Sequence, residues 1–300
     1  MQPDLTATPP PVASRPGMFS DLREIGRDLW EHRDLLLQLA RRDLTVRYKQ
    51  AVMGFAWAIF MPLLIVLAGC MVRLIMAEVS GSTVNRTAIA GLTVKSLGWS
   101  FFVGTIGFAV QSLTGNMNLV AKVYFPREVL PLSATLAQTV DTLLGTAVVS
   151  LLIGFMGVTP KLTMLWVPVL AVLLYLLTAG LALLLSCANL FFRDVKYIVQ
   201  VLLTFGIFFT PVLFEPAMLG PKLGTLAMLN PLAPLLEGLR LSVVAGHDLL
   251  TPLVEVNRHG QAVLVWSPWM LAYSAAWAAI GGVGSALLFH RLEFVFAEYV

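Results

Sequence analysis

Apolar residues in this chain form long runs that few charged residues interrupt. A transmembrane helix needs about 20 mostly apolar residues. Five runs reach this length and a sixth approaches it, and together they predict transmembrane helices at residues 51–76, 96–121, 131–158, 163–191, 197–214 and 266–289. We therefore expect an all-α membrane protein with six transmembrane helices per chain.

The segment at residues 20–50 has a different pattern. Apolar residues such as Leu22 and Ile25 share one helical face, and charged residues such as Arg23 and Arg27 lie opposite. This amphipathic pattern is typical of a helix on the membrane surface, and equally of a cytoplasmic helix packed on a partner protein. Both interpretations are compatible with an N-terminal interface helix.

Two further segments complete the predicted organisation. Residues 1–19 are rich in Pro, Ala, Ser and Thr, which predicts a disordered tail before the interface helix and the six-span transmembrane domain at 51–300. Residues 215–260 contain five prolines and apolar stretches too short to cross a bilayer. They predict short re-entrant or interfacial helices on the outer side, between the fifth and sixth spans.

Composition and charge agree with a membrane location. Hydrophobic residues make up 58% of the 300 residues and charged residues only 12%, about half the charged fraction of a soluble domain. The net charge of +3 gives no indication of nucleic-acid binding. With six spans, 13 of the 20 Lys and Arg residues fall on the side of the N-terminus, so we expect both termini in the cytoplasm.

The chain shows no motif for catalysis. It has no phosphate-binding loop, no HExxH or GxSxG motif and no Cys/His cluster, and its four histidines are scattered. We therefore expect no enzyme activity, no catalytic residue, no bound cofactor and no metal site. A membrane-embedded glycosyltransferase or acyltransferase stays open as an alternative, because it would need clustered acids or histidines rather than a named motif.

Three segments carry a more specific signal. They read RRDLTVRYKQAVMGFAWAIFMPLL at 41–64, NLVAKVYFPREVLPLS at 118–133, and NLFFRDVKYIVQ at 189–200 followed by FFTPVLFEP and LNPLAPLLEGLR. In this order and spacing, and with the ending at 292–300, they resemble the permease subunit of type 2 ABC exporters of cell-surface polysaccharides. The resemblance covers about residues 20–300.

The resemblance implies a function and a set of partners. Two permeases would form a homodimer in the bacterial inner membrane with two copies of a nucleotide-binding ATPase subunit, which would carry the ATP and Mg²⁺. The substrate would be an undecaprenyl-linked glycan, with O-antigen favoured over capsule or teichoic acid. An ion-driven flippase or secondary transporter is the rival class, but it predicts several intramembrane acids and an internal repeat, and the sequence shows one such acid and no obvious repeat.

The resemblance also assigns a coupling segment between the second and third spans. It would dock in a groove of the ATPase, and the helices at 216–246 would form the outer gate. The prolines make this short segment stiff, and an adjacent Arg–Glu pair offers polar contacts. The residues concerned are Tyr124, Phe125, Pro126, Arg127 and Glu128.

Two groups of residues are candidates for substrate contact. Positive charge at headgroup depth suits the pyrophosphate of a lipid-linked glycan, and attraction to anionic lipid is the alternative; these residues are Arg41, Arg42, Arg47 and Lys49. Aromatic rings could stack on sugar faces along a channel, although most such rings are interface anchors; these residues are Trp57, Trp99, Phe101, Phe102 and Tyr124.

Asp141 is an isolated acid within the third predicted span. If that span starts near Pro131, Asp141 lies about 15 Å into the membrane. A carboxylate at that depth is costly, so its side chain should face protein or water. We expect either a hydrogen-bonded contact between helices or a pore-lining position.

Overall fold

The computed structural model describes residues 17–49, 54, 56–80, 85–123, 125–256, 260–293 and 296. The expected disordered tail at 1–19 lies almost wholly outside these residues. Tyr124 and most of the C-terminal segment 292–300 also lie outside them.

The described residues are mostly helical, and four helical stretches are long and apolar enough to cross a membrane. They are Arg86–Ala109, Val129–Phe155, Leu162–Phe191 and Pro268–Leu292. The first, second and fourth are helices α4, α6 and α11, and the third combines the short helix η2 (Leu162–Leu165) with α7 (Trp166–Phe191). By length and hydropathy, these four stretches support a membrane protein with several spanning helices.

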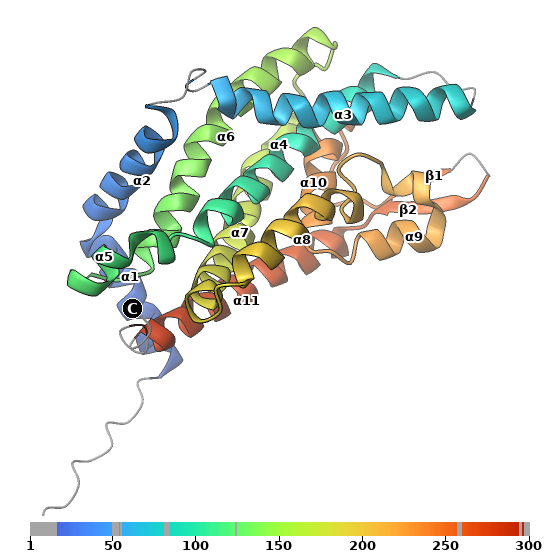
Figure 1. Cartoon of the computed structure of the whole chain (residues 1–300). Helices are drawn as coiled ribbons and strands as arrows, with labels where there is room; N and C mark the ends of the chain where they lie inside the picture. The colour runs from blue at the N-terminus through green and yellow to red at the C-terminus, as the bar shows by residue number, and fades with distance from the viewer. Residues whose placement is uncertain are drawn as a thin grey trace, which may run out of the picture.

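Two further helices follow shorter apolar stretches. Helix α3 (Ala56–Ser80) has 25 residues, but its continuous apolar part is Leu63–Ile75. Helix α8 (Val195–Phe209) has only 15 residues. Figure 1 shows α3 lying across one side of the bundle, against α4 and α6, while α8 lies on another side beside α4.

Helices α4 and α7 form the centre of the bundle, because each packs on several neighbours. Helices α7 and α11 approach so closely that a Cβ at Gly180 would lie 2.7 Å from the Cα of Gly282. Small residues that bring two backbones together are a common way to pack helices in lipid, where apolar side chains gain little by leaving the solvent. Gly180 and Gly282 thus fix the α7–α11 contact.

The second expected span, 96–121, does not correspond to one helix. Helix α4 starts at Arg86, ten residues earlier, and the chain then turns through η1 (Thr114–Asn116) into α5 (Met117–Lys122). The sequence interpretation started this span just after the charge of Lys95. In the structure Lys95 is fully buried inside α4, because a carboxylate from another helix neutralises it.

The interface segment is two helices rather than one. Helix α1 (Met18–Glu31) and α2 (Arg33–Tyr48) meet at His32, whose backbone departs from helical geometry. Helix α1 contacts the end of α11, and α2 packs along α6. Figure 1 shows α1, α2 and α5 at the same end of the molecule as the last turn of α11, called here the N-terminal end.

The opposite end, called here the hairpin end, holds short elements between α8 and α11 (Figure 1). These are η3 (Pro216–Leu219), α9 (Gly220–Ala227), α10 (Leu232–Arg240), η4 (Leu241–Ala245), β1 (Leu253–Val256) and β2 (Ala262–Trp266). The two antiparallel strands were not expected, so the all-α prediction is incomplete. Alternate apolar side chains of β2, Val263 and Val265, are fully buried, which explains the extended conformation there.

Candidate translocation and coupling sites

A cavity of about 530 Å³ opens between α4 and α8. Gly104, Gly107 and Phe108 contribute to its α4 wall. Polar side chains from α8 and from the turn after α4 line another part, and they are Gln111, Lys196, Gln200 and Thr204. A wall of mixed polarity inside an apolar bundle suits a ligand with both apolar and hydrophilic parts.

Arg47 lies behind this cavity and joins three helices. Its Nη1 donates to Asp141 Oδ2 at 2.8 Å and to Gln138 Oε1 at 3.0 Å, both on α6. Its guanidinium carbon lies 3.5 Å from the ring centroid of Phe108 on α4, a cation–π contact. A Cβ at Gly104 would lie 2.6 Å from the amide of Gln138, so a small residue there makes room for this network.

Asp141 is 5% exposed and faces protein, as the cost of an isolated buried carboxylate requires. Its partner is the arginine of another helix, so the contact between helices is an ion pair in addition to a hydrogen bond. Sequence reasoning did not pair Arg47 with Asp141, because 94 residues separate them.

The four basic residues proposed for the pyrophosphate are therefore not equivalent. Arg47 is committed to Asp141, and Arg42 donates to its neighbour Asp43 at 2.9 Å. Arg41 and Lys49 are exposed. Of the four, these two present their charge most freely to a ligand or to lipid.

The aromatic candidates also lie in different surroundings. Trp99 and Phe101 are buried in the main apolar core, 4% and 5% exposed, and they present no free ring face in this structure. Phe102 packs on Trp99 and is partly buried. Trp57 on α3 is exposed and meets Phe60 edge to face. Among these described rings, Trp57 is the most accessible.

The coupling segment is anchored to the C-terminal part of the chain. Phe125 is buried in the apolar cluster at the N-terminal end, where it shares a core with Phe289 and Phe296. The backbone N–H of Arg127 donates to Glu293 Oε1 at 3.1 Å, and its Nη1 donates to the carbonyl oxygen of Glu293 at 2.6 Å. The described part of the coupling segment is thus held against the C-terminal part of the chain.

Glu128 and His290 form a second contact between these parts. His290 Nδ1 lies 3.2 Å from Glu128 Oε1. Burial, and then the nearby charge of Glu128, raise the pKa of Glu293 to about 7. On the neighbouring helix α1, Asp21 is ion-paired with Arg291 at 2.9 Å. The N-terminal end therefore joins α1, the coupling segment and the end of α11 through buried or half-buried charges.

A second network of charges lies at the hairpin end, and sequence reasoning missed it. Glu237 of α10, fully buried, accepts from Arg240 at 2.6 Å and from Lys95 of α4 at 3.4 Å. Lys95 also donates to the carbonyl oxygen of Phe214 at 2.7 Å. These contacts tie α10 and the chain after α8 to the middle of the bundle.

The same network reaches α3 and the hairpin. Arg73 of α3 pairs with Glu215 at 2.9 Å, and Arg240 lies 3.9 Å from Glu255 of β1. Three cations and three carboxylates are therefore combined, which keeps this buried region neutral. Three of the seven positive charges that the expected topology leaves on the outer side, those of Arg73, Lys95 and Arg240, are structural partners here.

Membrane-length helices around a side cavity, with charge networks fixing both ends, define a polytopic membrane protein of the transporter class. The sequence pattern of the ABC-2 type transporter family matches residues 34–244, and the chain belongs to this family.

Curated relatives agree with this family. The chain is 29% identical over 204 residues to the O-antigen export system permease protein RfbA of Klebsiella pneumoniae, covering 68% of this chain and 77% of that protein. It is 28% identical over 212 residues to the protein of the same name from Myxococcus xanthus, covering 70% and 80%. These relatives are named as permeases rather than enzymes.

Proposed function

We propose that this chain is the permease subunit of an ABC exporter that moves a lipid-linked O-antigen across the bacterial inner membrane. The observation that carries the proposal is the family match over residues 34–244, joined to relatives named as O-antigen export permeases. The fold supports it, because an amphiphilic cavity lies at the side of the bundle, where a membrane lipid can reach it. Capsule and teichoic-acid polymers are the alternative cargoes.

The permease acts as a homodimer with six spans per chain and both termini in the cytoplasm. Helices α3 and α8 support this arrangement, because each carries a broad exposed apolar surface on the face that does not pack on the rest of the chain. The side chains concerned include Leu67, Met71 and Leu74 on α3, and Val201, Leu202 and Phe205 on α8. Pairing of such faces would enclose a conduit that one chain of this size does not form alone.

ATP binding and hydrolysis occur on separate ATPase subunits, which dock against the N-terminal end. The coupling segment supports this role, because its anchors to Glu293 and His290 allow a push on Arg127 or Glu128 to reach α11 directly. The glycan pyrophosphate enters beside Arg41 and Lys49, whose charges are exposed. The lipid part then follows the cavity between α4 and α8.

The substrate is tested by copurification. The permease is coexpressed with the ATPase encoded beside it in cells that make O-antigen, and lipids bound to the complex are identified by mass spectrometry. The proposal expects undecaprenyl-pyrophosphate-linked O-antigen. Recovery of a capsule or teichoic-acid precursor instead would assign that polymer as the cargo. A chain that binds no ATPase and exports no glycan would contradict its role as the permease of an ABC exporter.

The route is tested by filling the cavity. Gly107 lines the cavity and a Cβ there meets no atom within 4 Å, so Gly107→Phe directs a ring into the cavity from an open position. The proposal expects export to stop while the melting temperature stays unchanged. Gly284→Phe is the matched control, since Gly284 on α11 is equally open but lies away from the cavity. Wild-type export by Gly107→Phe would exclude this cavity from the route.

A further inference from the structure

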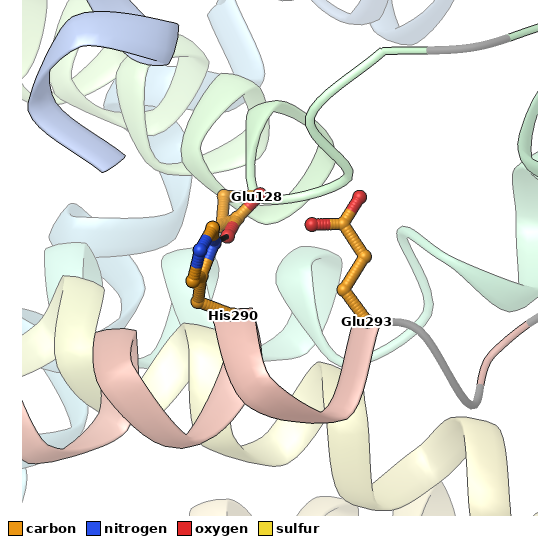
Figure 2. A group of neighbouring side chains, drawn as sticks. All are labelled: Glu128, His290 and Glu293. Atoms are coloured by element: carbon orange, nitrogen blue, oxygen red, sulfur yellow. Dashed lines mark hydrogen bonds and ion pairs between the residues drawn. The ribbon is translucent and has the colours of Figure 1, made fainter. Parts of the chain in front are cut away.

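Three side chains from distant parts of the sequence converge at the N-terminal end. Glu128 precedes α6, His290 lies in the last turn of α11, and Glu293 follows that helix. Each offers one ligand atom, and these three atoms lie within 4.8 Å of one another. Figure 2 shows the imidazole and the two carboxylates facing a common space. The sequence interpretation expected no metal site because it found no metal-binding motif, and 162 residues separate His290 from Glu128.

The cluster holds one buried carboxylate oxygen that has no partner among the described residues. It is Oε2 of Glu128, a residue that is 2% exposed. A buried carboxylate oxygen without a partner is costly. The nearby guanidinium of Arg291 is paired with Asp21, and that of Arg127 donates to a carbonyl oxygen of the backbone. The unpartnered oxygen therefore calls for another positive group.

The outer contacts of the cluster have the form found around bound metals. A histidine that ligates through one ring nitrogen usually directs the other at a carboxylate or carbonyl. Here Nδ1 of His290 faces Glu128, and Nε2 lies 3.9 Å from Glu24 Oε2 on α1. Glu293 is oriented by the backbone N–H of Arg127, which bonds Oε1.

We propose that Glu128, His290 and Glu293 bind one divalent transition-metal ion of the Zn²⁺ type at the base of the coupling segment. One imidazole nitrogen and two carboxylate oxygens are ligands that Zn²⁺ accepts, with water in the fourth position. The His290 Nδ1–Glu128 Oε1 separation of 3.2 Å agrees with the spacing of two ligands about 2 Å from a tetrahedral ion. The ion would fasten the coupling segment to the end of α11.

Zinc binding to the full-length permease, without a polyhistidine tag and held in lipid nanodiscs, tests the proposal. Zn²⁺ is titrated against a chromophoric chelator, and the bound metal is counted after dialysis. We expect about one Zn²⁺ per chain. The variants His290→Gln and Glu293→Gln should lose this ion, and Glu24→Gln should bind it about 10- to 100-fold more weakly, as loss of an outer partner does.

The controls separate this site from adventitious binding. His247→Gln, which changes a partly exposed histidine at the hairpin end, should keep the ion. Glu293 is only partly buried, so its Gln variant should fold even if a change at Glu128 does not. Any of three results would contradict the site. These are no Zn²⁺ binding by the wild type, wild-type Zn²⁺ binding by His290→Gln and Glu293→Gln, or loss of the ion from His247→Gln.

Metal binding and transport are measured separately. The zinc count needs no substrate and no ATPase, so it tests the metal site independently of the proposed O-antigen export. A proton shared between His290 and Glu128 is the other way to neutralise the cluster. It would leave the wild type without stoichiometric zinc and so contradict the metal site.

Discussion

The guanidinium of Arg47 lies 2.8 Å from the carboxylate of Asp141 and joins the end of α2 to the middle of α6. Both side chains are largely buried, 12% and 5% exposed. Removing one partner of such a pair leaves an uncompensated charge in an environment that solvates it poorly. The pair therefore fixes where the interface segment meets the bundle.

The first prediction concerns this pair. Asp141→Asn should lower the free energy of unfolding by about 3–5 kcal/mol, because Arg47 keeps its charge without a counterion. Arg47→Gln should have a similar effect, and the double variant should lose less than the sum of the two. Denaturant unfolding in detergent micelles measures all three. Arg41→Gln is the control, and additive losses would show that the two residues do not interact.

The second prediction concerns the network at the hairpin end. Glu237→Gln leaves Lys95 and Arg240 buried without their shared carboxylate, so unfolding should become easier by about 3–5 kcal/mol. Glu78→Gln, on the exposed face of α3, should change stability little. Equal melting temperatures for the two variants would mean that the network does not hold α10 in place.

The third prediction concerns the contact between α7 and α11. Gly180→Ala adds a methyl group that would meet the backbone of Gly282, so the helices must separate. Overpacking of this kind costs about 1–3 kcal/mol. Gly281→Ala should be tolerated, because a Cβ there meets no atom within 4 Å. Thermal unfolding compares Gly180→Ala with Gly281→Ala. A Gly180→Ala variant as stable as the wild type would show that α11 can move away from α7 without loss of stability.

The fourth prediction concerns pH. Burial, followed by the charges of Glu215 and Glu237, raises the pKa of Glu255 above its ordinary value of 4.5, although Arg240 opposes the shift. The contribution of Glu255 to stability is thus greatest below pH 4.5 and is lost as the pH rises through the higher folded pKa. Glu255→Gln should therefore melt at a slightly higher temperature than the wild type at pH 7.

The difference between Glu255→Gln and the wild type should shrink toward pH 4, where the carboxyl is protonated in both folded and unfolded chains. Glu31→Gln provides a control of opposite sign, because the hydrogen bond from Arg27 lowers the pKa of Glu31. A Glu255→Gln variant that melts below the wild type at pH 7 would show that the attraction to Arg240 outweighs burial.

The spanning helices could be predicted from sequence because lipid demands a continuous apolar run. The runs at 131–158, 163–191 and 266–289 lie over α6, α7 and α11. The same rule misplaced the start of α4, since a lysine was treated as a boundary. Lys95 is tolerated inside the helix because Glu237, 142 residues away, supplies the opposite charge.

The candidate site was predicted only in part, for the same reason. The family resemblance assigned the coupling segment, whose role stays a prediction, and the sequence pattern marked Asp141 as unusual. It did not show that Arg47 is the partner of Asp141, nor that Glu128 meets His290, because those contacts depend on how whole helices pack. The fold is therefore needed to distinguish basic residues that present a free charge from those that are paired with a carboxylate inside the protein.

The 15 residues of α8 span about 22 Å along the helix axis, whereas the hydrocarbon core of a bilayer is about 30 Å thick. At its end the chain turns at Thr210, whose hydroxyl accepts a hydrogen bond from the side chain of Asn230. In the proposed six-span arrangement, the lipid beside this helix would have to thin to meet polar groups at both of its ends. A headgroup that followed the cavity wall would then cross a shorter hydrophobic barrier here than along α6 or α7.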